Sequence, residues 1–587
     1  MPSLLEELSR LSGDAFAACG LDRALGEVRR SDRPDLCEYQ INGALAAAKA
    51  EKKNPHDVAA RVAEALKAAP VFDKIEIAGP GFINLTLKAE PLEVRLDALR
   101  GDARLGVDPA RPPLSVMVDF GGPNVAKTMH VGHLRSSILG DALQKLFRFL
   151  GHRVVSDIHM GVWGPQMGHL IAVVNRVYPD LPYFDPAFKG PYPDTSPVTM
   201  DDLEVLYPRA SAACKADPAR MEEARQATAE LQDGRPGYVA LWKHFIKVTE
   251  VGLKREFGAL GVAFDEWKGE SDAHPFIASM VANLKKAGLA VESEGALVVP
   301  VAEETDKKEI PPLILIKSDG AVLYGTTDLA TIVGRVKTHD PDLVLYVVDQ
   351  RQNGHFEQVF RAARKSGIAG KAALEHVGFG TINGPDGKPF KTREGGVMKL
   401  HELIAMAESE AAARLDEHEI GKDYPPEERR EIARKVGLAA LKYADLSNFR
   451  LTNYVLDLAR FTRFEGKTGP YLQYAAVRVK SLLRRAEGEG AALGPVQVTA
   501  PAERALALEN LSLPEVLATA AEKRAPNVIC DHVFALAQAF SRFYTEHHIL
   551  SEADAALRGS RLSLAALTLK AIECELGLLG IEIPDRM

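Results

Sequence analysis

Two histidines stand three residues apart in the stretch PNVAKTMHVGH, which covers residues 123–133. His130 and His133 bracket Gly132, and Lys127 precedes them in the same stretch. Imidazole N–H groups and a lysine ammonium donate hydrogen bonds that suit the oxygens of a phosphate. Glycine has no Cβ, so a ligand or another backbone can approach it closely. These residue types therefore predict an anion site, with a polyphosphate as its natural occupant.

The elements around this stretch place it where such a ligand binds. Leu114–Phe120 is an apolar run typical of a buried strand, and from Leu134 to Leu150 apolar residues recur at helical spacing. Gly151 ends the predicted helix, and HRVVSDI starts a second strand. The stretch thus lies at a strand-to-helix junction of a βαβ unit, where unpaired N–H groups of a helix attract anions. The alternative is a pair of solvent-facing histidines at a helix start, and the flanking pattern favours the phosphate site.

The composition limits what the chain can be. It has 587 residues, of which 46% are hydrophobic and 26% charged, as in a folded protein of two or three domains. A net charge of −8 argues against a protein that coats nucleic acid through bulk positive charge, although a local basic face could still bind RNA. Five scattered cysteines without a CxxC pair argue against a disulfide framework or a zinc site, so we expect no protein metal site.

The apolar runs bear on localisation. The start of the chain, MPSLLEELSRLSGDAF, has neither the basic start nor the long apolar run of a signal peptide. No apolar run approaches the roughly 20 residues of a membrane span. We therefore expect a cytoplasmic protein that does not bind a membrane.

Patterns along the chain predict three domains. Residues 1–110 combine helical patterns with an alternating, strand-like stretch at 74–87, which predicts a small α/β domain. In residues 111–423, short β-branched runs (LSVMVDF, HRVVSDI, PLILIKS and DLVLYVV) alternate with helical stretches, which is typical of a parallel sheet with crossover helices. This Rossmann-type domain carries an insertion around residues 179–235 that begins with a proline-rich segment. From 424 to 587 no strand pattern remains, and helical patterns predict an all-α bundle.

The histidine stretch resembles a known signature. HVGH at 130–133 is similar to the HIGH motif of class I aminoacyl-tRNA synthetases, and the longer sequence at 123–136 resembles the form found in arginyl-tRNA synthetases. In that family the two histidines hold the phosphates of ATP. The resemblance implies that they stabilise the charge that develops on the α-phosphate. The residues expected in this ATP site are Pro123, Lys127, His130, Gly132 and His133.

A second ATP-binding loop is expected downstream. Class I synthetases carry a KMSKS motif, and no such string occurs here. Residues 378–400 are rich in glycine, lysine and arginine, and FKTREGG within them resembles the divergent loop of many arginyl-tRNA synthetases. The second lysine of the usual motif is absent, and the family pattern implies that Lys127 supplies that charge. The alternative is a flexible basic hairpin. The residues expected in the loop are Lys388, Lys391, Thr392 and Arg393.

A site that selects arginine should offer carboxylates and an aromatic face, because a guanidinium is planar, always charged and rich in donors. Three stretches could supply them. Asp119 ends the first predicted strand, GAVLYGTTDLA at 320–330 precedes a predicted helix, and YVVDQRQNGHFEQVF at 346–360 follows a predicted strand. Such strand ends lie on the ligand-binding edge of a parallel sheet.

These three stretches also resemble blocks of arginyl-tRNA synthetases. The resemblance implies that Asp119, Tyr324 and Asp328 surround the guanidinium. It implies that Asn124 and Gln352 hold the α-amino and carboxylate end of the amino acid. Taken one by one, the residues have simpler interpretations: Asp328 as a helix N-cap, Tyr324 as a core ring and Gln352 as a solvent-exposed side chain.

A basic and aromatic stretch could face RNA. In residues 443–485, arginines and lysines interleave with phenylalanines and tyrosines, and these types hold phosphates and stack on unpaired bases. EGKTGPYLQYAAVR at 465–478 resembles the anticodon-binding domain of arginyl-tRNA synthetases, and residues 35–49 and 79–87 resemble the N-terminal domain of that family. The alternative is a helical bundle with a solvated face. The expected tRNA contacts are Arg450, Arg463, Lys467, Tyr471, Gln473 and Arg478.

The resemblance spans nearly the whole chain and implies a monomeric arginine–tRNA ligase. Such an enzyme forms arginyl-adenylate from L-arginine and ATP, with Mg²⁺ accompanying ATP and no prosthetic group, and transfers arginine to the terminal ribose of tRNA(Arg). Two alternatives stay open. A related enzyme could adenylate another amino acid or make a non-tRNA amide, and an inactive paralogue could bind tRNA without chemistry.

Overall fold

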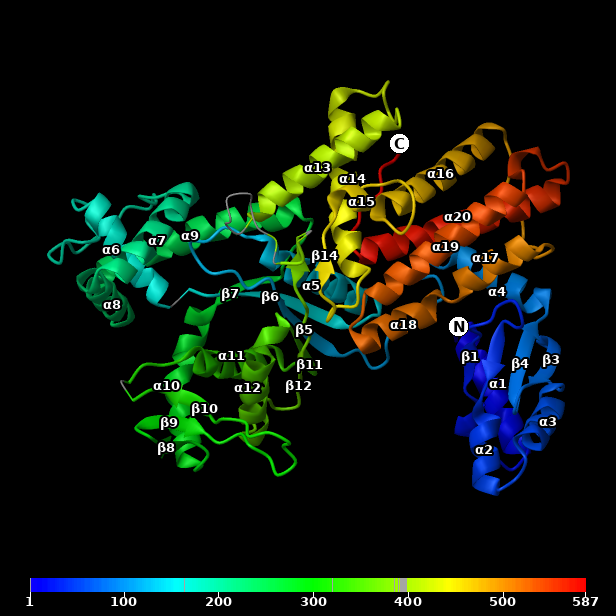
Figure 1. The fold of residues 1–587 in the computed structure, drawn as a ribbon, viewed down its shortest axis with the longest axis horizontal. Helices are drawn as coiled ribbons and strands as arrows, with labels where there is room; N and C mark the ends of the chain where they lie inside the picture. The colour runs from blue at the N-terminus through cyan, green and yellow to red at the C-terminus, as the bar shows by residue number, and fades with distance from the viewer. Residues whose placement is uncertain (1, 163, 319, 385, 389, 391–397) are drawn as a thin grey trace. The chain divides into compact units, whose positions relative to one another are not determined.

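The computed structural model describes residues 2–162, 164–318, 320–384, 386–388, 390 and 398–587 (Figure 1). The chain divides into two compact units. The sheet unit comprises Ala110–Ala413 and Ala440–Phe461, and the terminal unit comprises Met1–Pro109, Arg414–Ala439 and Thr462–Met587. Helices α13 (Leu400–Glu417) and α14 (Pro426–Leu446) each contribute residues to both units.

A five-stranded sheet forms the centre of the sheet unit. Its strand order is β12 (Ala373–His376), β11 (Leu343–Val347), β5 (Ser115–Phe120), β6 (Arg153–Met160) and β7 (Glu266–Gly269). Every neighbouring pair is parallel, which confirms the predicted α/β class with a parallel sheet. Helices cover the sheet, and the inner strands β5 and β11 are almost fully buried and mostly apolar.

Helix α5 (Val131–Phe149) begins within the histidine stretch, directly after His130, and packs on β5. Most of its residues are buried, and its close approach to the sheet depends on Gly140. A Cβ at this position would lie 2.1 Å from Cγ of Phe120 on β5, far inside contact distance. The tight packing of α5 on β5 therefore sets where the start of the helix lies relative to the strand ends.

The remaining helices of the sheet unit form two groups. The helices of the first group follow β6, and α6, α7 and α8 lie together beside the sheet (Figure 1). They are α6 (Pro165–Val177), α7 (Met200–Ala216), α8 (Pro218–Gln232) and α9 (Pro236–Ala259). The second group consists of α10 (Glu270–Lys286), α11 (Tyr324–His339) and α12 (Asn353–Lys365). The short helix α15 (Leu458–Phe461) comes last in this unit.

Two predictions about strands were wrong. The PLILIKS run, expected in the parallel sheet, forms β10 (Leu313–Ile316) in a separate antiparallel sheet with β9 (Ala296–Val299) and β8 (Val291–Ser293). Its residues alternate between buried and exposed, as an antiparallel strand with one solvated face permits.

Strand pairing also continues beyond residue 424. There β14 (Tyr454–Val455) pairs in parallel with β13 (Ile382–Asn383). A two-residue strand is too short to leave a periodic pattern in the sequence.

The terminal unit joins the two ends of the chain. Its N-terminal part carries an antiparallel sheet in the order β1 (Val28–Arg30), β2 (Tyr39–Ile41), β4 (Phe82–Leu87) and β3 (Phe72–Ala78). The helices of this part are α1 (Leu4–Ala18), α2 (Gly43–Glu51), α3 (Pro55–Leu66) and α4 (Ala89–Gly101). The C-terminal bundle consists of α16 (Gly469–Gly488), α17 (Pro501–Leu511), α18 (Leu513–Lys523), α19 (Asn527–Glu546) and α20 (Ala555–Leu578). The predicted N-terminal α/β part and C-terminal helical part are both confirmed.

Ion pairs link these two parts of the terminal unit. Arg504 on α17 donates to Glu38 at 3.0 Å, and Arg30 on β1 donates to Glu509 at 3.0 Å. These contacts join residues more than 460 positions apart in the sequence. Among the described residues, none of the helices combines the length and the apolar character that crossing a bilayer needs.

Candidate active site

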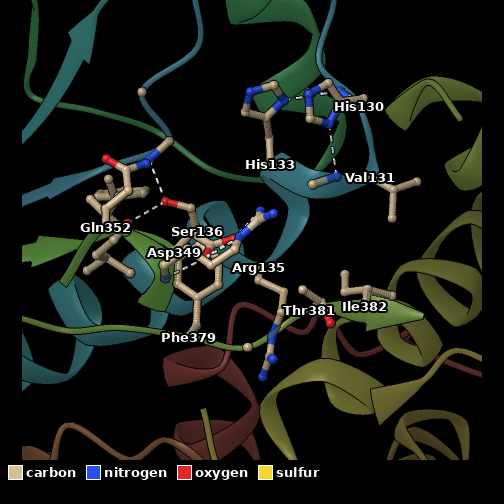
Figure 2. Close-up of a pocket in the computed structure, with 18 of the residues that line it drawn as sticks. His130, Val131, His133, Arg135, Ser136, Asp349, Gln352, Phe379, Thr381 and Ile382 are labelled. Carbon is tan, nitrogen blue, oxygen red and sulfur yellow. Dashed lines mark hydrogen bonds and ion pairs between the residues drawn. The ribbon is translucent and has the colours of Figure 1, made fainter. Parts of the chain in front are cut away.

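A cavity of about 500 Å³ opens at the carboxyl ends of β5 and β11 (Figure 2). Its floor includes Asp119 and Val347 from these strands, and the start of α5 contributes His130 and His133. The segment Phe379–Ile382, which leads into β13, forms a further wall. This is the edge of a parallel sheet where ligands bind, so the fold brings the predicted phosphate site to the expected place.

Backbone N–H groups fix the tautomers of the two histidines. His130 is the N-cap of α5, and its Nδ1 accepts the backbone N–H of Gly132 at 3.0 Å. Nδ1 of His133 accepts the backbone N–H of His130 at 3.1 Å (Figure 2). Because each Nδ1 is an acceptor, each neutral ring carries its proton on Nε2. Both imidazoles therefore offer an Nε2–H donor.

Burial keeps both rings neutral. The pKa of His133 is lowered to about 3, mainly by burial and then by the nearby His130 and Lys127. The pKa of His130 is also lowered, mainly by burial and then by Lys127. Neutral Nε2–H groups donate to phosphate oxygens without carrying a charge, so the positive charge of the site comes from lysine and arginine side chains.

The titration of His133 provides a direct check. With ¹³Cε1-labelled histidine, the His133 resonance is expected to keep its neutral position from pH 8 to about pH 5, because its folded pKa is about 3. An unfolded sample should titrate near pH 6.5. Since the folded state binds fewer protons than the unfolded state between these values, acidification should also reduce folding stability. A midpoint near pH 6.5 in the folded protein would contradict the assignment.

The loop before the histidines is held by α9, a role that the sequence did not reveal. Ala126 has a φ of +62°, which is strained for a residue with a Cβ, and its N–H donates to Oγ1 of buried Thr249 at 3.0 Å. Met129 donates its N–H to Oε2 of Glu256 at 2.9 Å, and burial raises the pKa of Glu256. In the sequence, Thr249 and Glu256 are only two polar residues within a long helical stretch, and this was the only sign of their contact with the loop.

Thr249→Val should therefore disturb the site without removing any group that contacts a ligand. Valine has nearly the shape of threonine but cannot accept the Ala126 N–H, so the strained turn next to Lys127 loses its support. We expect kcat of the ATP-dependent reaction that the resemblance implies to fall about 10-fold or more, since small misplacements of catalytic groups are costly. Thr249→Ser keeps the hydroxyl and should retain most activity. Equal activity of the Val and Ser variants would contradict this role.

Lys127 lies against the insertion. Its Nζ lies 5.1 Å from the ring centroid of Tyr207 on α7. On the same helix, Glu204 pairs with Lys399 at 2.6 Å. Residues 398–400 pair with the histidine stretch, because Val131 donates to the Met398 carbonyl at 3.0 Å and Leu400 donates to that of Met129 at 2.9 Å. The segment that follows the expected ATP loop therefore runs beside the predicted phosphate site.

The expected ATP loop is only partly described. Lys391, Thr392 and Arg393 lie outside the described residues. Lys388 is exposed, and its N–H bonds Oδ1 of Asp386 at 3.1 Å. Lys388 does not line the cavity, whereas Phe390 does.

The expected arginine-binding residues fall into two places. Asp119, Asn124 and Gln352 line the cavity. Tyr324 and Asp328 lie on the first turns of α11, where His355 Nε2 is 2.5 Å from Oδ2 of Asp328 and the His355 ring is 4.8 Å from that of Tyr324.

The structure excludes two of the simpler interpretations of these side chains and agrees with the third. Asp328 is not the N-cap of α11, because Leu323 holds that position. Tyr324 is 64% exposed, so it is not a core ring. Gln352 is exposed at the cavity, in the short 3₁₀ turn Gln350–Gln352 after β11.

The expected tRNA contacts differ in exposure. Arg463 and Lys467 are exposed, whereas Tyr471 and Arg478 are half-buried on α16. Arg450 donates to the Gly378 carbonyl at 3.1 Å within the sheet unit. Gln473 is fully buried and donates to the carbonyl oxygens of Lys435 and Glu582. A direct tRNA contact at Gln473 does not fit this burial, because its amide is used inside the bundle.

Two further features of the sheet unit were not foreseen. A buried ion pair joins Arg135 on α5 to Asp445 on α14, and Arg335 on α11 pairs with both Asp119 and Asp157. Within the described ranges, no three His, Cys, Asp or Glu side chains come together in a way that could hold a metal ion.

Comparisons with known protein families cover most of the chain. Residues 104–458 match the family model "tRNA synthetases class I (R), catalytic domain". Residues 4–87 match "Arginyl tRNA synthetase N terminal domain", and residues 472–587 match "DALR anticodon binding domain". The three matches follow the order of the parts described above.

Curated relatives are similar over their full length. The chain is 56% identical to the arginine–tRNA ligase of Maricaulis maris and 53% identical to that of Hyphomonas neptunium, in each case over 100% of both chains. The solved arginyl-tRNA synthetases of Plasmodium falciparum and Thermus thermophilus share the fold, with TM-scores of 0.82 and 0.80 over 100% of both chains at 23% and 24% identity. The chain belongs to the arginyl-tRNA synthetase family of class I aminoacyl-tRNA synthetases.

Proposed function

We propose that the cavity at the ends of β5 and β11 is where this arginine–tRNA ligase activates L-arginine with ATP. The carboxylate of arginine attacks the α-phosphate of ATP, pyrophosphate leaves, and arginyl-adenylate forms. A hydroxyl of the 3′-terminal ribose of tRNA(Arg) then attacks the arginyl carbonyl, and AMP leaves. The observation that carries this proposal is the pair of Nε2–H donors of His130 and His133 in the same cavity as Asp119.

The histidines act on the phosphates in this scheme. Fixed, neutral donors are aimed at the oxygens on which negative charge grows during attack, and their positions are set before the substrate arrives. Lys127 adds positive charge beside them, and Pro123 and Gly132 shape the loop and the helix start. Positioning and electrostatics suffice for such a transfer, so no covalent enzyme intermediate is needed.

The residues proposed for arginine bind its two ends. Asp119, Tyr324 and Asp328 take the guanidinium, which carboxylates and an aromatic face recognise well. Asn124 and Gln352 hold the α-amino and carboxylate groups. A site that satisfies a buried guanidinium rejects analogues that cannot make the same bonds by roughly 10⁴–10⁵-fold.

The finer parts of the scheme concern the second loop, the metal and the RNA. Lys388, Lys391, Thr392 and Arg393 cover the ATP phosphates, and Mg²⁺ enters with ATP and offsets phosphate charge. The monomer works in the cytoplasm. Residues 1–110 and 424–587 contact the tRNA(Arg), and the contacts proposed within 443–485 are Arg450, Arg463, Lys467, Tyr471 and Arg478.

Arginine-dependent ATP–pyrophosphate exchange tests the proposal. The assay is run with each of the twenty amino acids, with and without total tRNA. Exchange with arginine alone supports the proposed reaction, and exchange that appears only when tRNA is added means that Lys127 and the divergent loop suffice without KMSKS. Exchange with another amino acid would reassign the substrate. Binding of tRNA with no exchange for any amino acid would identify a tRNA-binding paralogue.

A further inference from the structure

Two buried carboxylates lie side by side at the carboxyl ends of β5 and β6. Asp119 and Asp157 are paired in register on these parallel strands, so both side chains leave the sheet on the same face. Asp119 is 9% exposed and Asp157 is 2% exposed. Two neighbouring carboxylates in a buried place repel each other unless a cation lies between them. Helix α11 supplies that cation.

Arg335 reaches both carboxylates through a single nitrogen. Its Nη2 lies 2.6 Å from Oδ2 of Asp119 and 2.7 Å from Oδ2 of Asp157. Its Cζ lies 5.3 Å from the ring centroid of Tyr346, which is the residue paired with Asp119 on β11. Asp157, Asp119 and Tyr346 thus form a row across three adjacent strands, and one guanidinium covers the row.

This arrangement leaves donors of Arg335 unused. Arg335 is 5% exposed, yet its Nε and Nη1 make no hydrogen bond in the part of the chain that the structure describes, and the Tyr346 ring lies beside them. An unpaired buried donor is costly, so a cation that served only to stabilise the sheet would be expected to use more of its donors. The arrangement therefore points to a role in the adjacent site.

The adjacent site is the cavity that Asp119 lines. Arg335 engages only Oδ2 of Asp119, and Oδ1 of this carboxylate has no hydrogen-bond partner among the described residues. Asp328 lies seven residues before Arg335, nearly two turns earlier on α11, so the two side chains leave the helix on the same face. The guanidinium of Arg335 therefore lies next to the proposed binding place of the guanidinium of the substrate.

We propose that Arg335 is a positioning residue for arginine binding, which holds Asp119 by Oδ2 so that Oδ1 stays available to the guanidinium of the substrate. Asp157 shares the Arg335 nitrogen and keeps it from engaging both oxygens of Asp119. This inference rests on the proposed function, in which Asp119 binds the substrate. In this proposal Arg335 orients the carboxylate of Asp119, and Asp119 recognises the arginine substrate.

Arg335→Ala tests the inference through the substrate and through chemical rescue. The variant is expected to raise KM for arginine about 10-fold or more while KM for ATP stays unchanged, because the phosphate site lies at the start of α5. Guanidinium chloride at millimolar concentration should lower this KM again, by filling the space of the missing side chain. In the unchanged protein the same ion should compete with arginine and raise KM. Sodium chloride at equal ionic strength controls for salt.

Arg361→Ala is the matched control. Arg361 on α12 is another arginine of the sheet unit with little exposure, held by Asp306 at 2.7 Å, and it does not line the cavity. Its loss should leave KM for arginine unchanged and show no rescue by guanidinium. Asp157→Asn is the second test if Arg335→Ala does not fold. It frees Arg335 to engage both oxygens of Asp119, so KM for arginine should rise while KM for ATP does not.

The outcomes separate the two proposals. An unchanged KM for arginine in folded Arg335→Ala, or a raised KM that guanidinium does not lower, overturns the role of Arg335. An unchanged KM in Asp157→Asn overturns it when Arg335→Ala fails to fold. Absence of arginine-dependent exchange in the unchanged protein is a failure of the proposed function instead.

Discussion

Replacing His133 by asparagine is expected to lower kcat of arginine-dependent pyrophosphate exchange by about 10²–10³-fold, with little change in KM for arginine. The Nδ1 of His133 accepts the His130 N–H, and an asparagine side chain can still reach that position. The variant loses the Nε2–H donor, which is proposed to stabilise charge only as the α-phosphate is attacked. An interaction made in the transition state appears in kcat and not in ground-state binding.

His130→Asn is also expected to lower kcat of pyrophosphate exchange, because it too loses an Nε2–H donor. His130 is the N-cap of α5, and asparagine is a favoured N-cap, so the helix keeps its start while the donor is lost. Gln variants at either position serve as the matched controls, because the glutamine amide reaches the Nε2 position and should retain more activity. Thermal unfolding midpoints close to that of the unchanged protein would show that the fold is intact. A change confined to KM for arginine would rule out the phosphate role.

Asp445→Ala is expected to destabilise the sheet unit by about 3–5 kcal/mol, the usual cost of removing one partner of a buried ion pair. The Nε of Arg135 lies 2.7 Å from Oδ1 of Asp445, with side chains 4% and 2% exposed. Arg135 also donates to the Thr452 carbonyl at 2.9 Å, and its Cζ lies 5.2 Å from the Tyr454 ring centroid. Loss of the carboxylate leaves the guanidinium buried without its counter-charge.

Calorimetry that resolves the transition of the sheet unit measures this effect. The control is the double variant Arg135→Met/Asp445→Leu, which removes both charges and should recover most of the stability. Activity should fall in Asp445→Ala as well, since Arg135 lies two residues after His133 and lines the cavity. A loss below about 1 kcal/mol, or a double variant as unstable as the single one, would show that the pair is not the source of the stability.

Local patterns in the sequence were enough for the class of fold and for the position of the histidine stretch between a strand and a helix. Three features lie within about forty residues: the apolar run before residue 121, the glycine-containing HVGH and the helical spacing after it. Short-range periodicity therefore reveals them. The parallel sheet, the N-terminal α/β part and the helical C-terminal part followed in the same way. The antiparallel pairing of Leu313–Ile316 did not, because four alternating residues fit either kind of sheet.

The sequence by itself determined that His130 and His133 stand at the start of a helix after a buried strand, and that the chain resembles arginyl-tRNA synthetases. Only the tertiary structure decided what surrounds them: Thr249 and Glu256 behind the loop, Asp445 against Arg135, and Arg335 across Asp119 and Asp157. Each of these partners lies more than 120 residues along the chain from the group that it holds. Asp119 and Asp157 are closer to each other in the sequence, and the register of β5 and β6 brings them together. Register, helix packing and burial are properties of the folded chain, and they also set the low pKa of His133. No pattern of neighbouring residues contains them, because each depends on segments that meet only when the sheet has formed.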